Sequence, residues 1–302
     1  MTEPHTLTAY FTYCKLQKNL DDKTLKAYRI DLEQFVRQYA QPTGVSRAEV
    51  EQYIEQLMSR YKASTVKRKI AALKAYYRYL VYQEILEHSP FEKIELRIRQ
   101  EVLLPRTIDR QALGAIFSAA YRELHAAGSP AARRDALRNV AVLELLFASG
   151  VRVSELCTIT CDHLDLENQV VLIRGKGSRE RRIYLASPPV IQAYSLVRTP
   201  LAPNEPFFFL NRKGKRLSEQ SVRRIINRCA SLAQQSGHYT PHMFRHSFAT
   251  YLWDACGDVY EVKEILGHSS IKTTELYVHA SFERQKKVLS SMHPRSALHL
   301  TC

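Results

Sequence analysis

The sequence predicts an α+β protein that is mainly helical and carries a small antiparallel β-sheet in its C-terminal part. Apolar residues recur at helical spacing, most regularly over about the first 90 residues. Two short β-prone runs, 169–174 and 179–185, flank the glycine-rich segment 175–178 and are together typical of a hairpin. An apolar fraction of 45% with only 10 glycines and 12 prolines describes an ordered globular chain.

The first 90 residues predict a small helical domain. The expected helices are 7–20, 22–40, one that begins after Ser46, and 64–82. Glu49 follows Ser46 by three residues, which is the spacing of a capping box. The segment Gln41-Pro42-Thr43-Gly44 breaks the helix before it, and Ser64 is expected to cap the last helix.

A linker is expected between His88 and Thr107, where the helical pattern loosens. Ser89-Pro90 and Leu104-Pro105 each oppose a continuing helix, and the charges between them alternate without an apolar face. We therefore predict a first domain over 1–90, a linker over 91–106 and a second domain over 107–302.

The second domain is expected to place further helices around the hairpin. These begin at Thr107, near residue 132, at Ser218, at Thr240 and at Asp258, with one more after residue 281. Gly150 and Gly267 are the expected helix stops. Thr240 is followed by Pro241, whose missing N–H costs nothing in a first helical turn.

A net charge of +14 suggests a polyanionic partner, nucleic acid first and an anionic membrane surface second. Charge alone does not exclude a merely soluble basic protein. The basic run within 62–74 favours contact with a phosphate backbone over a solvated helix face. The predicted DNA contacts are Lys62, Lys67, Arg68, Lys69 and Lys74, with Arg223 and Arg224, for which simple solvent exposure is an equal alternative.

The six cysteines are scattered along the chain. Residues 1–10 lack the basic and then apolar pattern of a secretory leader, so we expect reduced thiols and a cytoplasmic protein. Cys157, Cys161 and His163 lack a fourth ligand at zinc-site spacing, so no metal site is expected. The most apolar run, 140–148, contains a glutamate and is too short to span a bilayer.

Two histidines, an arginine and a tyrosine near the C-terminus have the chemistry to hold an anion and move a proton. His242 and Arg245 are three apart, so they project from one helix face near the positive end of its dipole. His268 follows a helix stop, and Tyr277 is a candidate nucleophile. Taken singly, each residue has an ordinary interpretation: a capping side chain for His242, a loop residue for His268 and a core aromatic for Tyr277.

Two basic residues upstream extend this set. Arg152 follows a glycine break, and Glu155 lies one helical turn away, within reach to hold the arginine. Lys176 is at the hairpin tip between two glycines, which leave the tip sterically open. The ordinary interpretations are a surface arginine and an exposed turn lysine.

The ordered set Arg152, Lys176, His242-x-x-Arg245, His268 and Tyr277 resembles the signature of tyrosine site-specific recombinases, the phage integrase family, and most closely its Xer-like group. The resemblance implies a helical core-binding domain followed by a catalytic domain. It also implies duplex DNA with an inverted-repeat recombination site as the partner. The expected assembly on synapsed DNA is a homo-tetramer, or a hetero-tetramer with a second recombinase.

The resemblance also implies a reaction without metal, cofactor or ATP. Tyr277 would attack the scissile phosphate to give a 3′-phosphotyrosyl enzyme and a free 5′-hydroxyl, and the ester would store the energy for resealing. The other implied roles are phosphate binding for Arg152 and Arg245, support of Arg152 for Glu155, general base for His242, general acid for Lys176 and a hydrogen bond to a non-bridging oxygen for His268. Fixed guanidinium groups would replace divalent ions in neutralising the transition state.

Two other functions remain open from the sequence. A type IB topoisomerase uses the same chemistry but religates the original strand as a monomer. An architectural DNA-binding protein would carry a degenerate site, against which the completeness of the residue set argues. A synaptic assay with two labelled sites distinguishes recombination from simple relaxation.

Overall fold

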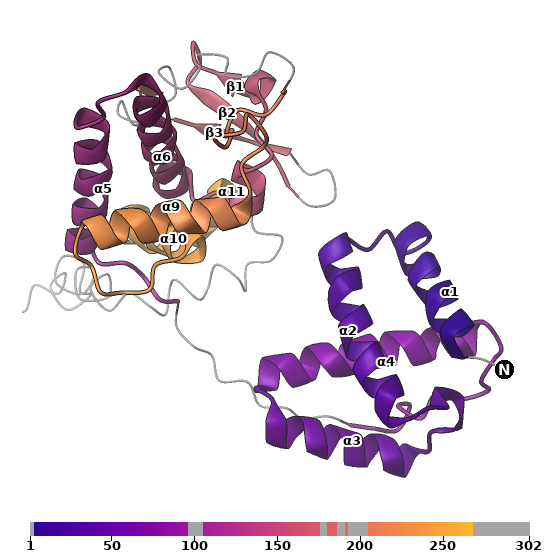
Figure 1. Ribbon diagram of the computed structural model, residues 1–302. Coiled ribbons are helices and arrows are strands. Elements are labelled where there is room, and N and C mark those ends of the chain that lie inside the picture. The colour runs from indigo at the N-terminus through magenta and orange to yellow at the C-terminus, as the bar shows by residue number, and fades with distance from the viewer. Residues whose placement is uncertain (1–2, 96–104, 176–179, 186–190, 193–204, 268–302) are drawn as a thin grey trace, which may run out of the picture. The chain divides into compact units, whose positions relative to one another are not determined.

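A computed structural model describes residues 3–95, 105–175, 180–185, 191–192 and 205–267 of the 302-residue chain. The chain forms two compact units, residues 1–102 and 103–302 (Figure 1). Each unit has its own hydrophobic core. The division falls inside the predicted linker. In the described part of the chain, no helix has the length and apolar character needed to cross a bilayer.

The N-terminal unit is helical, as its periodicity predicts. Its helices are α1 (Glu3–Leu16), α2 (Asp22–Gln38), α3 (Arg47–Arg60) and α4 (Ala63–Tyr82), with a 3-10 turn over Pro42–Gly44. Helix α4 packs against both α2 and α3, and its buried face is rich in tyrosine. The buried hydroxyl of Tyr77 donates a hydrogen bond to the Pro42 carbonyl at 2.8 Å. Phe91 and Ile94 also pack into this core, so the unit continues beyond residue 90.

Local capping chemistry explains most helix starts, with two corrections. Ser46 and Glu49 form the expected capping box at the start of α3. Ser64 does not cap α4, because the helix begins at Ala63 and Lys62 occupies the cap position without a side-chain bond. Thr107 is likewise not a cap, because Asp109 accepts the Ala112 N–H and the helix starts after it.

The basic run of α4 does not lie on one surface. Lys69 is buried, and its ammonium donates to Asp31 at 2.9 Å and to Gln34. Arg68 also pairs with Asp31 but keeps a partly exposed side chain. The prediction that Lys69 contacts phosphate is therefore wrong. Every third or fourth residue of this helix faces the core, and Lys69 lies on that face.

The C-terminal unit consists of helices with a small sheet at one side. The helices are α5 (Arg110–His125), α6 (Pro130–Ser149), the short α7 (Val153–Leu156), α9 (Glu219–Leu232), α10 (Pro241–Cys256) and α11 (Val259–Leu266). Helix α6 packs against both α5 and α10, and α9 covers α5 (Figure 1). Figure 1 also shows the sheet lying at the side of α6, and strand β2 contacts α7.

The described sheet is antiparallel in the order β1–β2–β3, with β1 at Leu164–Asp165, β2 at Val170–Arg174 and β3 at Glu180–Tyr184. The predicted hairpin is β2 and β3, in a register that pairs Ile173 with Arg181. Strand β1 was missed because two residues carry no readable alternation. Ser218 and Thr240 cap α9 and α10 as expected, and Asp258 caps α11.

The buried charge pair in the N-terminal unit leads to a stability prediction. Lys69→Met should lower the free energy of unfolding by about 3 kcal/mol, because Asp31 would keep a buried charge with one partner fewer. Urea unfolding followed by circular dichroism measures this change. Lys67→Met is the control, since Lys67 is exposed on the same helix, and should change stability by no more than about 0.5 kcal/mol. Equal unfolding midpoints for the two variants would contradict the structural role of Lys69.

Candidate active site

The site is organised around the glycine that ends α6. Gly150 has a φ of 59°, in the left-handed region that favours glycine. A Cβ atom at this position would lie 2.5 Å from Cδ1 of Phe248 and 2.7 Å from Cδ2 of Leu266. Only glycine therefore fits both the backbone and the space. The turn brings Arg152 to the start of α7 two residues later.

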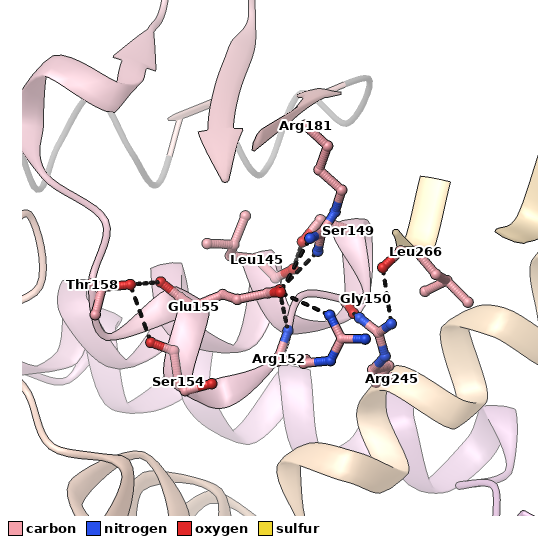
Figure 2. Close-up of polar contacts among 10 residues, drawn as sticks. All are labelled: Leu145, Ser149, Gly150, Arg152, Ser154, Glu155, Thr158, Arg181, Arg245 and Leu266. Carbon is pink, nitrogen blue, oxygen red and sulfur yellow. Dashed lines mark hydrogen bonds and ion pairs between the residues drawn. The ribbon is translucent and has the colours of Figure 1, made fainter. Parts of the chain in front are cut away.

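Arg152 and Glu155 make the contact expected from their spacing (Figure 2). The Arg152 Nη1 atom donates to the Glu155 carboxylate at 2.9 Å, and the Arg152 backbone N–H donates to the same carboxylate at 2.9 Å. Glu155 is buried, whereas the Arg152 side chain is 40% exposed. The carboxylate thus holds an arginine whose other donors remain accessible from outside.

A second arginine, Arg181, shares the Glu155 carboxylate. Its Nη1 and Nη2 atoms donate to the two carboxylate oxygens at 3.1 and 2.8 Å (Figure 2). Burial raises the pKa of Glu155, but the bonds and charge of Arg181, followed by those of Arg152, outweigh burial and hold that pKa below its ordinary range. Glu155 is therefore ionised at neutral pH.

Arg181 was not among the predicted site residues, although the sequence carries a signal for it. It occupies the same set of alternate positions as Ile183 in β3 and Leu185 just after the strand, both of which are buried. An arginine on the inward face of a strand needs a charged or hydrogen-bonding partner. The pattern could have flagged Arg181, but it could not have named Glu155 as the partner.

Arg245 is buried and joins two helix ends. It projects from the second turn of α10, where its Nη1 atom donates to the Gly150 carbonyl and its Nη2 atom donates to the Leu266 carbonyl at 2.9 Å. Gly150 caps α6 and Leu266 is the last residue of α11, so one guanidinium connects α6, α10 and α11 (Figure 2). Helix carbonyls at these ends have no intrahelical partner, which makes them good acceptors for a cation.

His242 lies in the first turn of α10, one turn before Arg245, on a helix that Thr240 caps by accepting the Met243 N–H. Partial desolvation, and after it the positive charge of Arg245, lower the pKa of His242; Arg223 and Arg152 lower it further. A lowered pKa leaves the imidazole neutral at neutral pH, the form that accepts a proton.

The remaining predicted residues are three catalytic candidates and the DNA contacts. Lys176, His268 and Tyr277 fall outside the described residues, although Gly175 and Gly267, which directly precede two of them, are described. Among the predicted DNA contacts of the N-terminal unit, Lys62 and Lys67 are exposed and Lys74 is half-buried. In α9, the Nη2 atom of Arg223 lies 3.6 Å from Oε2 of Glu219. Arg224 is exposed and lines a cavity of ≈ 720 Å³ between α5, α6 and α9.

The described residues therefore bring positive charge together from distant parts of the chain. Arg152 and Arg181 share one carboxylate, and Arg245 and Arg223 act on the same histidine as Arg152. Planar guanidinium groups suit the oxygens of a phosphate, which they bind bidentately at any working pH. The arrangement is chemically fitted to bind an anion beside a neutral imidazole.

The sequence matches two family models. Residues 118–284 match the phage integrase family, and residues 7–84 match the phage integrase N-terminal SAM-like domain. The first match includes the whole set from Arg152 to Tyr277.

Comparison with individual proteins also finds recombinases. A tyrosine recombinase of Agathobacter rectalis is 42% identical over 97% of this chain and 97% of its own length. Tyrosine recombinase XerC of Bacillus subtilis is 31% identical, with 95% of each chain covered. In fold, the chain is similar to XerH site-specific recombinase bound to palindromic difH substrate in a post-cleavage complex, with a TM-score of 0.72 and 24% identity over 93% of this chain and 83% of that one.

The electrostatics of His242 can be measured directly. Its ring should titrate below about 6.5 in NMR spectra, with the resonance assigned by its loss in His242→Gln. Arg223→Gln should raise this pKa, because a positive charge that opposes protonation is removed. Arg224→Gln is the matched control and should leave the value unchanged. A pKa at or above the ordinary value, or one insensitive to Arg223, would contradict the described electrostatics.

Proposed function

The chain belongs to the phage integrase family and is a tyrosine recombinase, and from this premise we propose that it cuts and rejoins duplex DNA through a 3′-phosphotyrosyl bond formed by Tyr277. The observation that carries the assignment of residues is the convergence around Gly150. Arg152 lies two residues after Gly150, and Arg245, 95 positions from Gly150, donates to the Gly150 carbonyl. Two arginines far apart in sequence therefore meet at one turn, which supports the proposal that both bind the same phosphate.

The proposed cleavage step exchanges one phosphate ester bond for another. The Tyr277 oxygen attacks the scissile phosphorus and His242 accepts the phenolic proton, for which its neutral form is suited. The bond from phosphorus to the 5′-oxygen breaks, and Lys176 gives that oxygen a proton. His268 donates to a non-bridging oxygen. Rejoining reverses these transfers with a 5′-hydroxyl as the nucleophile, so no ATP is needed.

Charge on the phosphate is proposed to be neutralised by arginine rather than by metal. Arg152 has an accessible guanidinium held by a buried carboxylate, which fixes its direction before substrate arrives. Preorganised donors of this kind are worth more than mobile ones because they need no reorganisation during the reaction. We therefore propose a reaction that proceeds in the presence of a chelator.

The proposed substrate is duplex DNA that carries an inverted-repeat site. The net charge of +14, the exposed Lys62 at the N-cap of α4 and the exposed Lys67 within α4 support binding to phosphates. The structurally similar XerH is bound to a palindromic substrate. Two half-sites on each of two synapsed duplexes require four protomers, which is the basis for a tetramer of this chain alone or with a second recombinase. A DNA substrate of this kind makes the cytoplasm the proposed location.

Trapping the covalent adduct tests the nucleophile. With a suicide substrate nicked next to the cleavage point, and with EDTA present, wild type should accumulate a protein–DNA adduct and Tyr277→Phe should form none, because phenylalanine has no attacking oxygen. Denaturing gels of labelled DNA measure the adduct. An adduct from the phenylalanine variant would assign the nucleophile elsewhere, and a requirement for added metal would overturn the metal-free mechanism.

The two arginines should fail in different ways. Arg152→Ala should retain duplex binding and stability but reduce cleavage about 10²- to 10³-fold, because a preorganised donor is lost. Arg245→Ala should also lower the unfolding midpoint, since the Gly150 and Leu266 carbonyls lose their donor. Arg245→Lys should not restore activity, because an ammonium lacks the planar fork that reaches both carbonyls. Loss of DNA binding without loss of cleavage chemistry would instead indicate a role in docking.

A further inference from the structure

Arg181 occupies an inward position at the base of the β2–β3 hairpin. Its side chain is only 14% exposed, and it pairs in register with Ile173 of β2. The aliphatic stem lies against Gly267: a Cβ atom there would come within 2.9 Å of Arg181 Cδ and 3.1 Å of Nη1. The absence of a side chain at Gly267 therefore leaves the space that the guanidinium occupies.

Both terminal nitrogens of Arg181 are committed to one acceptor. They donate to Oε1 and Oε2 of Glu155 at 3.1 and 2.8 Å, a fork-to-fork arrangement (Figure 2). Arg152 makes a single side-chain bond to the same carboxylate, at 2.9 Å. Glu155 is thus bound more extensively by Arg181 than by the arginine next to it in sequence.

The charges explain why a second arginine is useful here. Paired with Glu155 alone, Arg152 would form a neutral unit, and the carboxylate would repel an incoming phosphate as strongly as the guanidinium attracts it at a distance. With Arg181 included, the three groups carry a net charge of +1. Arg181, the bidentate partner, neutralises the Glu155 carboxylate and leaves the accessible Arg152 available to an anion.

We propose that Arg181 is a positioning residue of the cleavage site, which neutralises and holds Glu155 so that Arg152 presents an uncompensated positive charge to the scissile phosphate. The inference rests on the proposed function of Arg152. It assigns Arg181 no contact with DNA: the residue acts through Glu155. A residue that merely braced the hairpin would act independently of the charge on Glu155, and this difference is measurable.

The test is a double-mutant cycle on single-turnover cleavage of the suicide substrate. Arg181→Gln should slow cleavage about a hundredfold, with duplex binding retained, because the unopposed carboxylate then cancels Arg152. Glu155→Gln alone should also slow cleavage, because Arg152 loses its support. In the Arg181→Gln background, however, Glu155→Gln should speed cleavage, since it removes the offending charge. This reversal of sign is specific to the proposed role.

The double variant also covers the case in which Arg181→Gln does not fold, because it buries no unpaired carboxylate. It should cleave within about twofold of Glu155→Gln, as expected when one residue acts only through the other. A double variant far slower than Glu155→Gln would overturn the inference. So would a double variant whose loss of cleavage rate equals the product of the losses in the two single variants. Arg181→Lys should recover part of the rate, since it restores the charge but not the bidentate bond.

Arg182→Gln is the matched control, because Arg182 is the next residue of β3 and is exposed on the opposite face. It should cleave at the wild-type rate. The outcomes separate this inference from the proposed function. If wild type forms no adduct, the proposed function fails; if wild type forms one and Arg181→Gln forms it equally fast, only the role of Arg181 fails.

Discussion

The hydrogen bonds from the buried Arg245 guanidinium are the interaction on which the rest of the site depends. Its two terminal nitrogens hold the Gly150 carbonyl at the end of α6 and the Leu266 carbonyl at the end of α11. The first bond sets the turn that leads into Arg152, and the second sets the point from which the chain continues to His268. A residue proposed to contact phosphate is therefore also part of the scaffold, and it is the planar fork of the guanidinium, which lysine lacks, that reaches both carbonyls.

A buried acid between two arginines holds both of them and still leaves a net positive charge. Glu155 is enclosed, ionised and bonded to two guanidinium groups from α7 and β3. Burying a charge is unfavourable unless it is paired, and here two guanidinium groups pair with one carboxylate, which leaves one positive charge in excess. The surplus lies at Arg152, the more exposed of the two partners. Rigid support and a net positive field thus come from the same three side chains.

The N-terminal unit shows that a basic stretch of sequence is not the same as a basic surface. Lys67 is exposed on α4, whereas Lys69, two residues later, reaches inward to Asp31 and Gln34. A helix turns 100° per residue, so neighbouring lysines point in different directions. The ion pair connects α2 to α4 and contributes to the packing of that unit.

Local chemistry in the sequence determined where elements begin and end. Ser46, Ser218, Thr240 and Asp258 cap helices as their side chains predict, and Gly150 and Gly267 stop helices at positive φ because other residues are strained there. These features depend on neighbours three or four residues away. The order of the basic residues likewise carried the family resemblance. What only the tertiary structure decided is which groups meet: Arg181 with Glu155, Lys69 with Asp31, and Arg245 with two helix ends. Such pairings join segments far apart in sequence, and they are selected by burial, since a charge enclosed by the fold must find its partner wherever the packing brings one.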